Sequence, residues 1–157
     1  MRSFARYWLP PLLWMALIWG VSSNLGSADN TASSFAWILT ALFPWATAAE
    51  IELAHRVIRK FGHLTEYAIL AALWFRALYA GRRLPSTQSA LAALAISVAW
   101  AIADEVHQSF VPSRGASALD VLFDSAGAAL VLFVVARLHL EPRIQRVAQA
   151  VAEEVDA

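Results

Sequence analysis

Four apolar segments, each close to the length that crosses a bilayer, constrain the fold of this chain more than any other feature. They cover residues 5–23, 57–79, 90–108 and 119–137. A helix needs about 20 residues to cross the hydrocarbon core of a membrane. The composition agrees, since 59% of the 157 residues are hydrophobic and only 15% are charged. We therefore predict an all-α fold, an integral membrane four-helix bundle that forms a single domain over residues 1–157.

The first segment admits a second interpretation. Its basic start, short apolar run and small residues such as Ser22 and Ser23 are also the pattern of a secretory signal peptide, which would be cleaved. However, the segment contains tandem prolines, Pro10 and Pro11, and three tryptophans. Tryptophan favours membrane interfaces and proline kinks a helix, so a retained, kinked first helix is the favoured prediction.

Shorter segments complete the expected fold. Residues 33–43 are apolar but too few to cross a membrane, and Pro44 follows them, so we predict an interfacial or re-entrant helix after the first span. Residues 22–32, 81–89 and 110–118 have the composition of loops and turns. The tail at 142–157 carries apolar residues at helical spacing, which predicts an amphipathic surface helix.

The distribution of positive charge predicts the orientation. Most arginines lie at three alternating points of the four-helix path, namely Arg2 and Arg6, then Arg76, Arg82 and Arg83, then Arg137, Arg143 and Arg146. Cytoplasmic loops carry an excess of arginine and lysine, so we predict a multi-pass protein with both termini in the cytoplasm. Arg56, Arg59 and Lys60 depart from this rule, because the same path places them outside. The start of the second span, the end of the third and the start of the fourth then meet at the extracytoplasmic face.

Polar side chains are concentrated at that meeting point. A charged side chain at the bilayer centre costs roughly 2.5 to 3.5 kcal/mol, so such groups normally pair or line a polar cavity. We therefore predict a shared polar site, whose members are Lys60, His63, Glu66, Tyr67, Asp104, Glu105, His107, Gln108, Arg114, Asp120 and Asp124. On the fourth helix Ser117, Asp120, Asp124 and Gly127 share one face, and the glycine there lets another helix approach closely.

The polar stretches resemble a known family. KFGHLTEY (residues 60–67) and DEVHQSFVPSRGASALDVLFDSAG (residues 104–127), with the two serines after the first span, are similar to the VanZ-like family. The family pattern of Lys-x2-His-x3-Tyr, Asp-Glu-x2-Gln-x3-Pro-x-Arg and Asp-x3-Asn-x2-Gly falls on Lys60, His63, Tyr67, Asp104, Glu105, Gln108, Pro112, Arg114, Asp120 and Gly127. Asp124 departs from this pattern, because the family often has asparagine at that position.

The resemblance implies a four-span protein of the bacterial inner membrane. It also implies a contribution to envelope or glycopeptide resistance, because some relatives are associated with low-level resistance to teicoplanin. The expected partner is a membrane lipid, or an amphipathic glycolipid or glycopeptide. The resemblance implies no particular reaction.

The residues themselves favour a site that binds or modifies a lipid head group. Crowded carboxylates in a low-dielectric site acquire separated pKa values, as general acid–base catalysis requires. The predicted proton-transfer residues are Asp104, Glu105, Asp120 and His63. The predicted binding residues are Lys60, Glu66, Tyr67, Gln108, Arg114, Ser117 and Asp124, of which Lys60 and Arg114 would hold a phosphate or carboxylate.

Other interpretations of the same residues stay open. Asp104, Glu105, Asp120 and Asp124 could hold a divalent cation, although no cofactor is expected, and His63 and His107 lack a zinc motif. The alternatives are a non-enzymatic binding or shielding protein, a small proton-coupled or ion-coupled transporter, and purely structural ion pairs of Asp104 with Arg114 and of Lys60 with Glu66. Zero net charge argues against nucleic acid as a partner, and the absence of cysteine removes thiol chemistry.

Overall fold

The computed structural model describes residues 2–23, 36–111 and 116–155. All regular structure in this part of the chain is helical, which confirms the all-α prediction. The elements are α1 (Arg2–Tyr7), α2 (Leu9–Ser22), a helical segment at 36–42, α4 (Ala48–Arg76), the π-helix η2 (Ala77–Gly81), α5 (Ser86–Ser109) and α6 (Ala118–Val155). The helical segment at 36–42 lies where a short helix was predicted after the first span.

The first apolar segment is a kinked pair of helices, as its prolines predict. α1 ends at Tyr7 and α2 begins at Leu9, with Trp8 between them. Pro10 and Pro11 have no amide hydrogen, so they cannot donate to the carbonyls one turn earlier, and the hydrogen-bond ladder is interrupted at this point. Both prolines lie in the first turn of α2, where the missing donors cost little.

α4 begins nine residues earlier than the predicted second span, because a capping box starts it at Thr47. The Thr47 backbone N–H donates to a carboxylate oxygen of Glu50 at 2.8 Å. The Glu50 N–H donates in return to the Thr47 hydroxyl at 3.4 Å. Two donors that a helix start leaves unpaired are thereby satisfied. The predicted span at 57–79 lies within the continuous path of α4 and η2.

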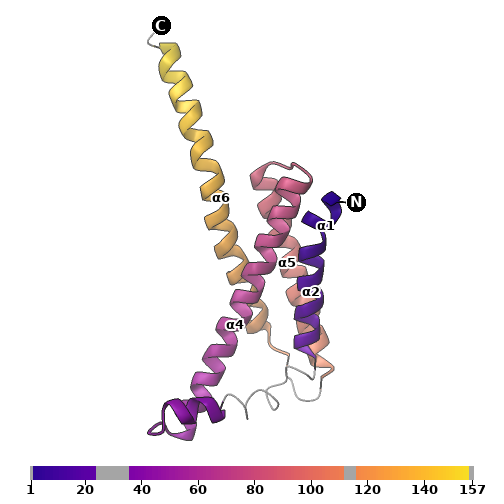
Figure 1. Cartoon of the computed structure of the whole chain (residues 1–157), viewed down its shortest axis with the longest axis vertical. Coiled ribbons are helices and arrows are strands. Elements are labelled where there is room, and N and C mark those ends of the chain that lie inside the picture. The colour runs from indigo at the N-terminus through magenta and orange to yellow at the C-terminus, as the bar shows by residue number, and fades with distance from the viewer. Residues whose placement is uncertain (1, 24–35, 112–115, 156–157) are drawn as a thin grey trace.

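Two predicted boundaries are wrong. The turn expected at 81–89 is shorter, because α5 already begins at Ser86, directly after Pro85. The C-terminal tail is helical but is no separate surface helix, because α6 runs without a break from Ala118 to Val155. Pro142 removes one backbone donor, but its neighbours Leu138–Glu141 and Arg143–Gln145 contain no glycine or turn residue that would end the helix. The far end of α6, yellow in Figure 1, extends beyond the other helices.

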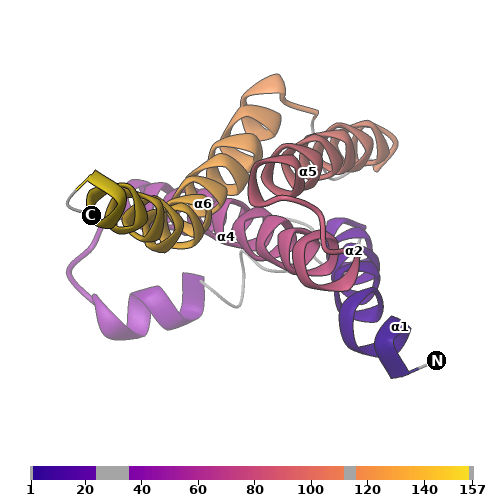
Figure 2. The ribbon, with the colours of Figure 1, turned by 90° about the horizontal axis from the view of Figure 1, so that it is seen from above.

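The bundle is built around α4, which packs against α6, α5 and α2. The view from above shows α4 between α6 on one side and α2 on the other (Figure 2). Its buried face carries Tyr67, Leu70, Ala71 and Trp74, and α5 and α6 present small residues to it. At Gly127 an added Cβ would lie 2.2 Å from the backbone oxygen of Leu64. The absence of a side chain therefore lets the backbones of α4 and α6 approach closely, as predicted for this glycine.

Two helices in the described part of the chain combine the length and the hydropathy needed to cross a bilayer. They are Ser86–Ser109 and the Ala118–Leu138 part of α6. α2 is apolar but shorter, and α4 carries several charges in its first half. Large apolar side chains such as Leu91, Leu122 and Leu130 are exposed on α5 and α6. An exposed apolar surface of this kind suits contact with lipid, so the two helices suggest a membrane protein.

Candidate functional site

The polar residues lie where three helix ends meet the middle of α4. α2 and α5 both end at this level and α6 begins there (Figure 1). The aromatic and basic residues of the other end of the bundle lie far from it, with the guanidinium of Arg76 over the ring of Tyr7 and that of Arg82 over the ring of Trp8. The cations of that other end are therefore separate from the polar residues around the middle of α4.

Asp104 is the most deeply buried acid, with 1% of its surface exposed. One carboxylate oxygen accepts hydrogen bonds from the Ser22 hydroxyl at 2.8 Å and from the Gln108 side-chain amide at 2.9 Å. The same amide nitrogen lies 3.4 Å from the Ser22 hydroxyl. The other oxygen, Oδ1, has no hydrogen-bond partner among the described residues. A buried carboxylate with a vacant acceptor is costly to maintain, so this position needs a reason beyond packing.

A second polar group connects α4 to α6. Lys60 Nζ lies 2.8 Å from Asp120 Oδ1, and both side chains are partly exposed. His63 Nδ1 lies 3.7 Å from Asp124 Oδ1, and Asp124 is buried. Lys60 thus pairs with Asp120, and not with Glu66 as the purely structural alternative had it. Residues six apart on a helix point about 120° apart, so the side chains of Lys60 and Glu66 do not share a face.

Glu105 belongs to a third group, between α5 and α6. Its carboxylate accepts a hydrogen bond from the backbone N–H of Ser117, just before α6 begins. Both residues line a pocket of about 290 Å³ between the two helices. Neighbouring residues on a helix point about 100° apart, so Asp104 faces α2 while Glu105 faces α6.

Tyr67 links these groups at the centre of the bundle. It is fully buried, and its hydroxyl has no hydrogen-bond partner in the described part of the chain. The carboxylates of Asp104, Asp124, Glu66 and Glu105 all lie within electrostatic range of this phenol. One acid from each of the three polar groups, Asp104, Asp124 and Glu105, therefore interacts electrostatically with this phenol.

The remaining predicted members have other places. His107 stacks on the Trp19 ring at 4.2 Å and faces α2. Arg114 and Pro112 lie outside the described residues, so the expected pair of Asp104 with Arg114 does too. In the part of the chain that the structure describes, no three histidine, aspartate or glutamate side chains gather in a way that could hold a metal ion. Asp104, Glu105, Asp120 and Asp124 each turn to a different partner, which gives the cation hypothesis no support.

One contributor to the site was not predicted as such. Ser22, at the end of α2, provides the hydroxyl that meets Asp104 across 82 residues of sequence. The paired serines after the first span were the available signal, since a hydroxyl at a helix end is a common partner for a buried carboxylate. Trp14 adds a second link from α2, because its indole N–H donates to the backbone oxygen of Glu66 at 2.9 Å.

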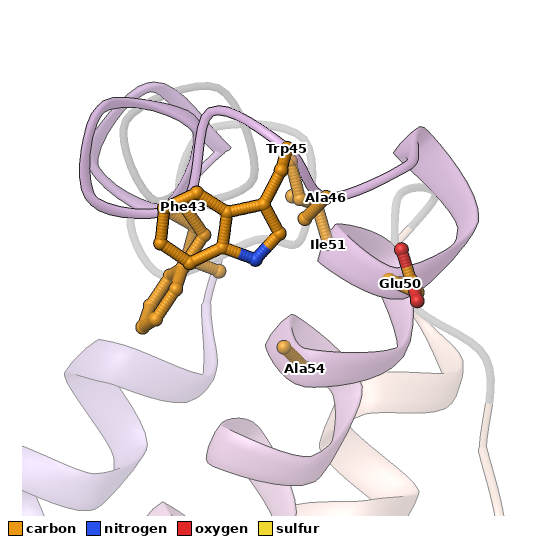
Figure 3. A pocket seen from close by; sticks show the side chains of 7 residues that line it. Phe43, Trp45, Ala46, Glu50, Ile51 and Ala54 are labelled. Carbon is orange, nitrogen blue, oxygen red and sulfur yellow. The ribbon is translucent and has the colours of Figure 1, made fainter.

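A second pocket, of about 270 Å³, lies at the first turns of α4 (Figure 3). Its wall is apolar, and it is lined by Leu39, Phe43, Trp45, Ala46, Ile51 and Ala54, with Glu50 at the edge. The carboxylate of Glu50 is bonded to Thr47 and does not turn into the pocket. The residues that line this pocket come before Lys60 in the sequence, and none of them belongs to the polar groups.

A family model described as VanZ/LLP1 matches residues 7–139 of the chain. The matched range includes every predicted site residue, the second, third and fourth predicted spans, and the first span from residue 7 onward. No curated protein and no solved structure matches this chain.

Proposed function

We propose that this chain, which belongs to the VanZ/LLP1 family, is a multi-pass membrane protein that binds the polar head group of a membrane lipid or glycolipid. The binding site is the polar end of the bundle, where Asp104, Tyr67 and Asp124 have buried oxygens without a hydrogen-bond partner among the described residues. This observation carries the proposal. A buried acceptor without a partner is costly, and a ligand hydroxyl or amine that reached it would remove that cost.

The contact between Ser22 and Asp104 supports a hydroxyl as the group that binds. In the present arrangement the Ser22 hydroxyl donates to the carboxylate at 2.8 Å, with Gln108 beside it. A sugar or glycerol hydroxyl can make the same bond. Because Asp104 is buried, a ligand hydroxyl would have to displace that of Ser22 or open the packing around the second oxygen of Asp104.

The chemistry available to a bound head group is proton transfer. A carboxylate at hydrogen-bond distance from a hydroxyl can accept its proton, and a neighbouring histidine can pass the proton on. In this proposal Asp104, which already accepts a hydrogen bond from a hydroxyl, takes the first role, and His63, 3.7 Å from Asp124, takes the second. Lys60 and Asp120 are partly exposed and would meet the outer part of the head group.

A non-enzymatic version of the same proposal uses the same residues. An amphipathic glycopeptide such as teicoplanin offers hydroxyl groups and an apolar chain, as a glycolipid does. Capture of such a molecule at the polar end would shield the envelope without any reaction. The partly exposed pair of Lys60 and Asp120 favours this possibility, because it can be reached without opening the bundle.

The test compares membrane lipids from cells that express the wild type with those from cells expressing Asp104→Asn with Asp120→Asn. Asparagine keeps the shape and one acceptor oxygen but cannot take up a proton. A lipid species that changes only with the wild type identifies the reaction by its mass. Identical profiles refute the enzymatic version.

A control variant at an exposed acid outside the site, Glu52→Gln, should leave the profile and abundance unchanged. The shielding version is tested separately, by the teicoplanin susceptibility of the same strains. If the double variant protects cells as well as the wild type does, and gives the same lipid profile as the wild type, the polar end has neither proposed role.

A further inference from the structure

The pocket between α5 and α6 is lined mostly by apolar side chains and by one acid, Glu105. Ile102, Val106, Ala116, Ala118 and Val121 form its apolar part. Glu105, Ser109 and Ser117 are its polar residues, and Glu105 is buried while Ser109 is exposed. The pocket therefore offers a hydrocarbon surface that ends at a carboxylate and two hydroxyls.

Its position along the helices fits a bilayer interface. The lining residues come from the last two turns of α5, from Ala116 and Ser117 just before α6, and from the first turn of α6. These are the two helices whose length and hydropathy suit a membrane crossing. Lipid head groups begin where such spans end. The exposed side chains at the pocket rim, Ile102 and Val106, would then face lipid chains.

The charge of the surroundings indicates the kind of head group. Glu105 interacts electrostatically with Asp124, and so do Asp104, Asp120 and Glu66. Lys60 forms an ion pair with Asp120 and is not among the residues that line this pocket. A group that brings N–H or O–H donors is favoured in an acidic environment of this kind, whereas a group with acceptors alone is not.

We propose that a bilayer lipid enters laterally between α5 and α6, with one hydrocarbon chain along Ile102, Val106 and Val121. Its head group, which donates hydrogen bonds through an amine or hydroxyl, lies against Glu105. At about 290 Å³ the pocket is at the lower end of ligand cavities, roughly 300–1,000 Å³, so it holds part of one chain and not a whole lipid. This inference rests on the proposed function, since it describes how the head group reaches the polar end.

The test is photolabelling of purified protein in phosphatidylcholine vesicles that contain a phosphatidylethanolamine with a photoactivatable chain. Val121→Trp fills the pocket, and Leu122→Trp is the matched control, because Leu122 is the next residue on α6 and is 63% exposed. Labelling of the peptide that contains Ile102 and Val106 should fall several-fold in Val121→Trp and stay unchanged in the control. Equal labelling in both variants overturns the proposal.

Ala118→Trp provides the same block if Val121→Trp does not fold, because Ala118 lies at an exposed position of the pocket rim. The head group is tested with a photoactivatable phosphatidylcholine, which has no N–H or O–H donor. Phosphatidylethanolamine should label the wild type several-fold more strongly, and Glu105→Leu should abolish that preference. Equal labelling by the two lipids refutes the role of Glu105.

The two proposals fail in different ways. If Val121→Trp is labelled as the wild type is, while the cellular lipid profile still depends on Asp104 and Asp120, only the lateral access route is wrong. If Val121→Trp loses its label while the lipid profile is independent of both aspartates, lipid enters as proposed and the proton-transfer chemistry is wrong.

Discussion

The close approach of α4 and α6 at Gly127 makes a substitution there the sharpest test of the bundle. In Gly127→Ala the new Cβ would lie 2.2 Å from the Leu64 backbone oxygen, about 1.2 Å short of ordinary contact at 3.4 Å. A backbone carbonyl in a helix cannot turn away as a flexible side chain can. The two helices must therefore separate, or α6 must rotate.

The size of the effect follows from two opposing terms. Overpacking of this kind costs roughly 1–3 kcal/mol. Replacing glycine by alanine in a helix returns roughly 0.8–1.0 kcal/mol through intrinsic propensity. We expect a net loss of roughly 0–2 kcal/mol in the free energy of unfolding. A separation of about 1 Å would also move His63 and Asp124, now 3.7 Å apart, beyond ion-pair distance, about 4 Å.

The assay is reversible unfolding of the purified protein in mixed detergent, with Gly62→Ala as the matched control. Gly62 also lies on α4, but nothing is within 4 Å of the Cβ that would be added there. Gly62→Ala should be neutral or slightly stabilising, because only the propensity term acts. If Gly127→Ala is as stable as Gly62→Ala, the two helices do not meet at this residue. The contacts of Lys60 with Asp120 and of His63 with Asp124 are then wrong too.

Three smaller changes test individual contacts. Ser22→Ala removes a donor to the buried Asp104 carboxylate and should lower the unfolding free energy by about 1–2 kcal/mol in the same detergent assay. Lys60→Met should cost less than about 1 kcal/mol, because exposed ion pairs contribute little, yet it should reduce teicoplanin protection of cells. The backbone N–H and then the hydroxyl of Thr47 hold the pKa of Glu50 below its ordinary value. Any stability from this contact is present above the ordinary carboxyl pKa and is lost as the pH falls through the lowered one. Thr47→Ala keeps the N–H, so the pKa of Glu50 should rise only part of the way, as carboxyl NMR titration would show.

The helices were predictable because their signals are local. Apolar runs of spanning length and the proline pair near the N-terminus depend only on neighbours in sequence. The start of α4 was missed although its signal was present, because the pattern of Thr47 followed three residues later by Glu50 is a capping box. The continuity of α6 through Pro142 was not predictable from the proline alone, since one lost donor is a small part of a 38-residue helix.

The partners within the polar end were less predictable than its members. Sequence placed Lys60 and Asp120 at neighbouring helix ends, but which acid meets the lysine depends on the rotation and depth of α6 against α4. Those are set by the contact at Gly127, where the backbones come together. Likewise Ser22 reaches Asp104 because α2 packs against α5 and ends at the level where α5 ends. Tertiary packing decides such pairings, and no local pattern encodes it.

Asp104 separates the structural interpretation of the site from the functional one. An asparagine there could accept the same two hydrogen bonds, from Ser22 and Gln108, without the cost of a buried charge. If the residue serves only to hold α2 and α5 together, Asp104→Asn should keep or raise stability and leave the lipid profile and teicoplanin protection intact. If the carboxylate acts on a ligand, the same change should again keep or raise stability but abolish function. A gain in stability together with a loss of function is what a residue retained for chemistry produces, because active sites keep charges that packing alone would not favour.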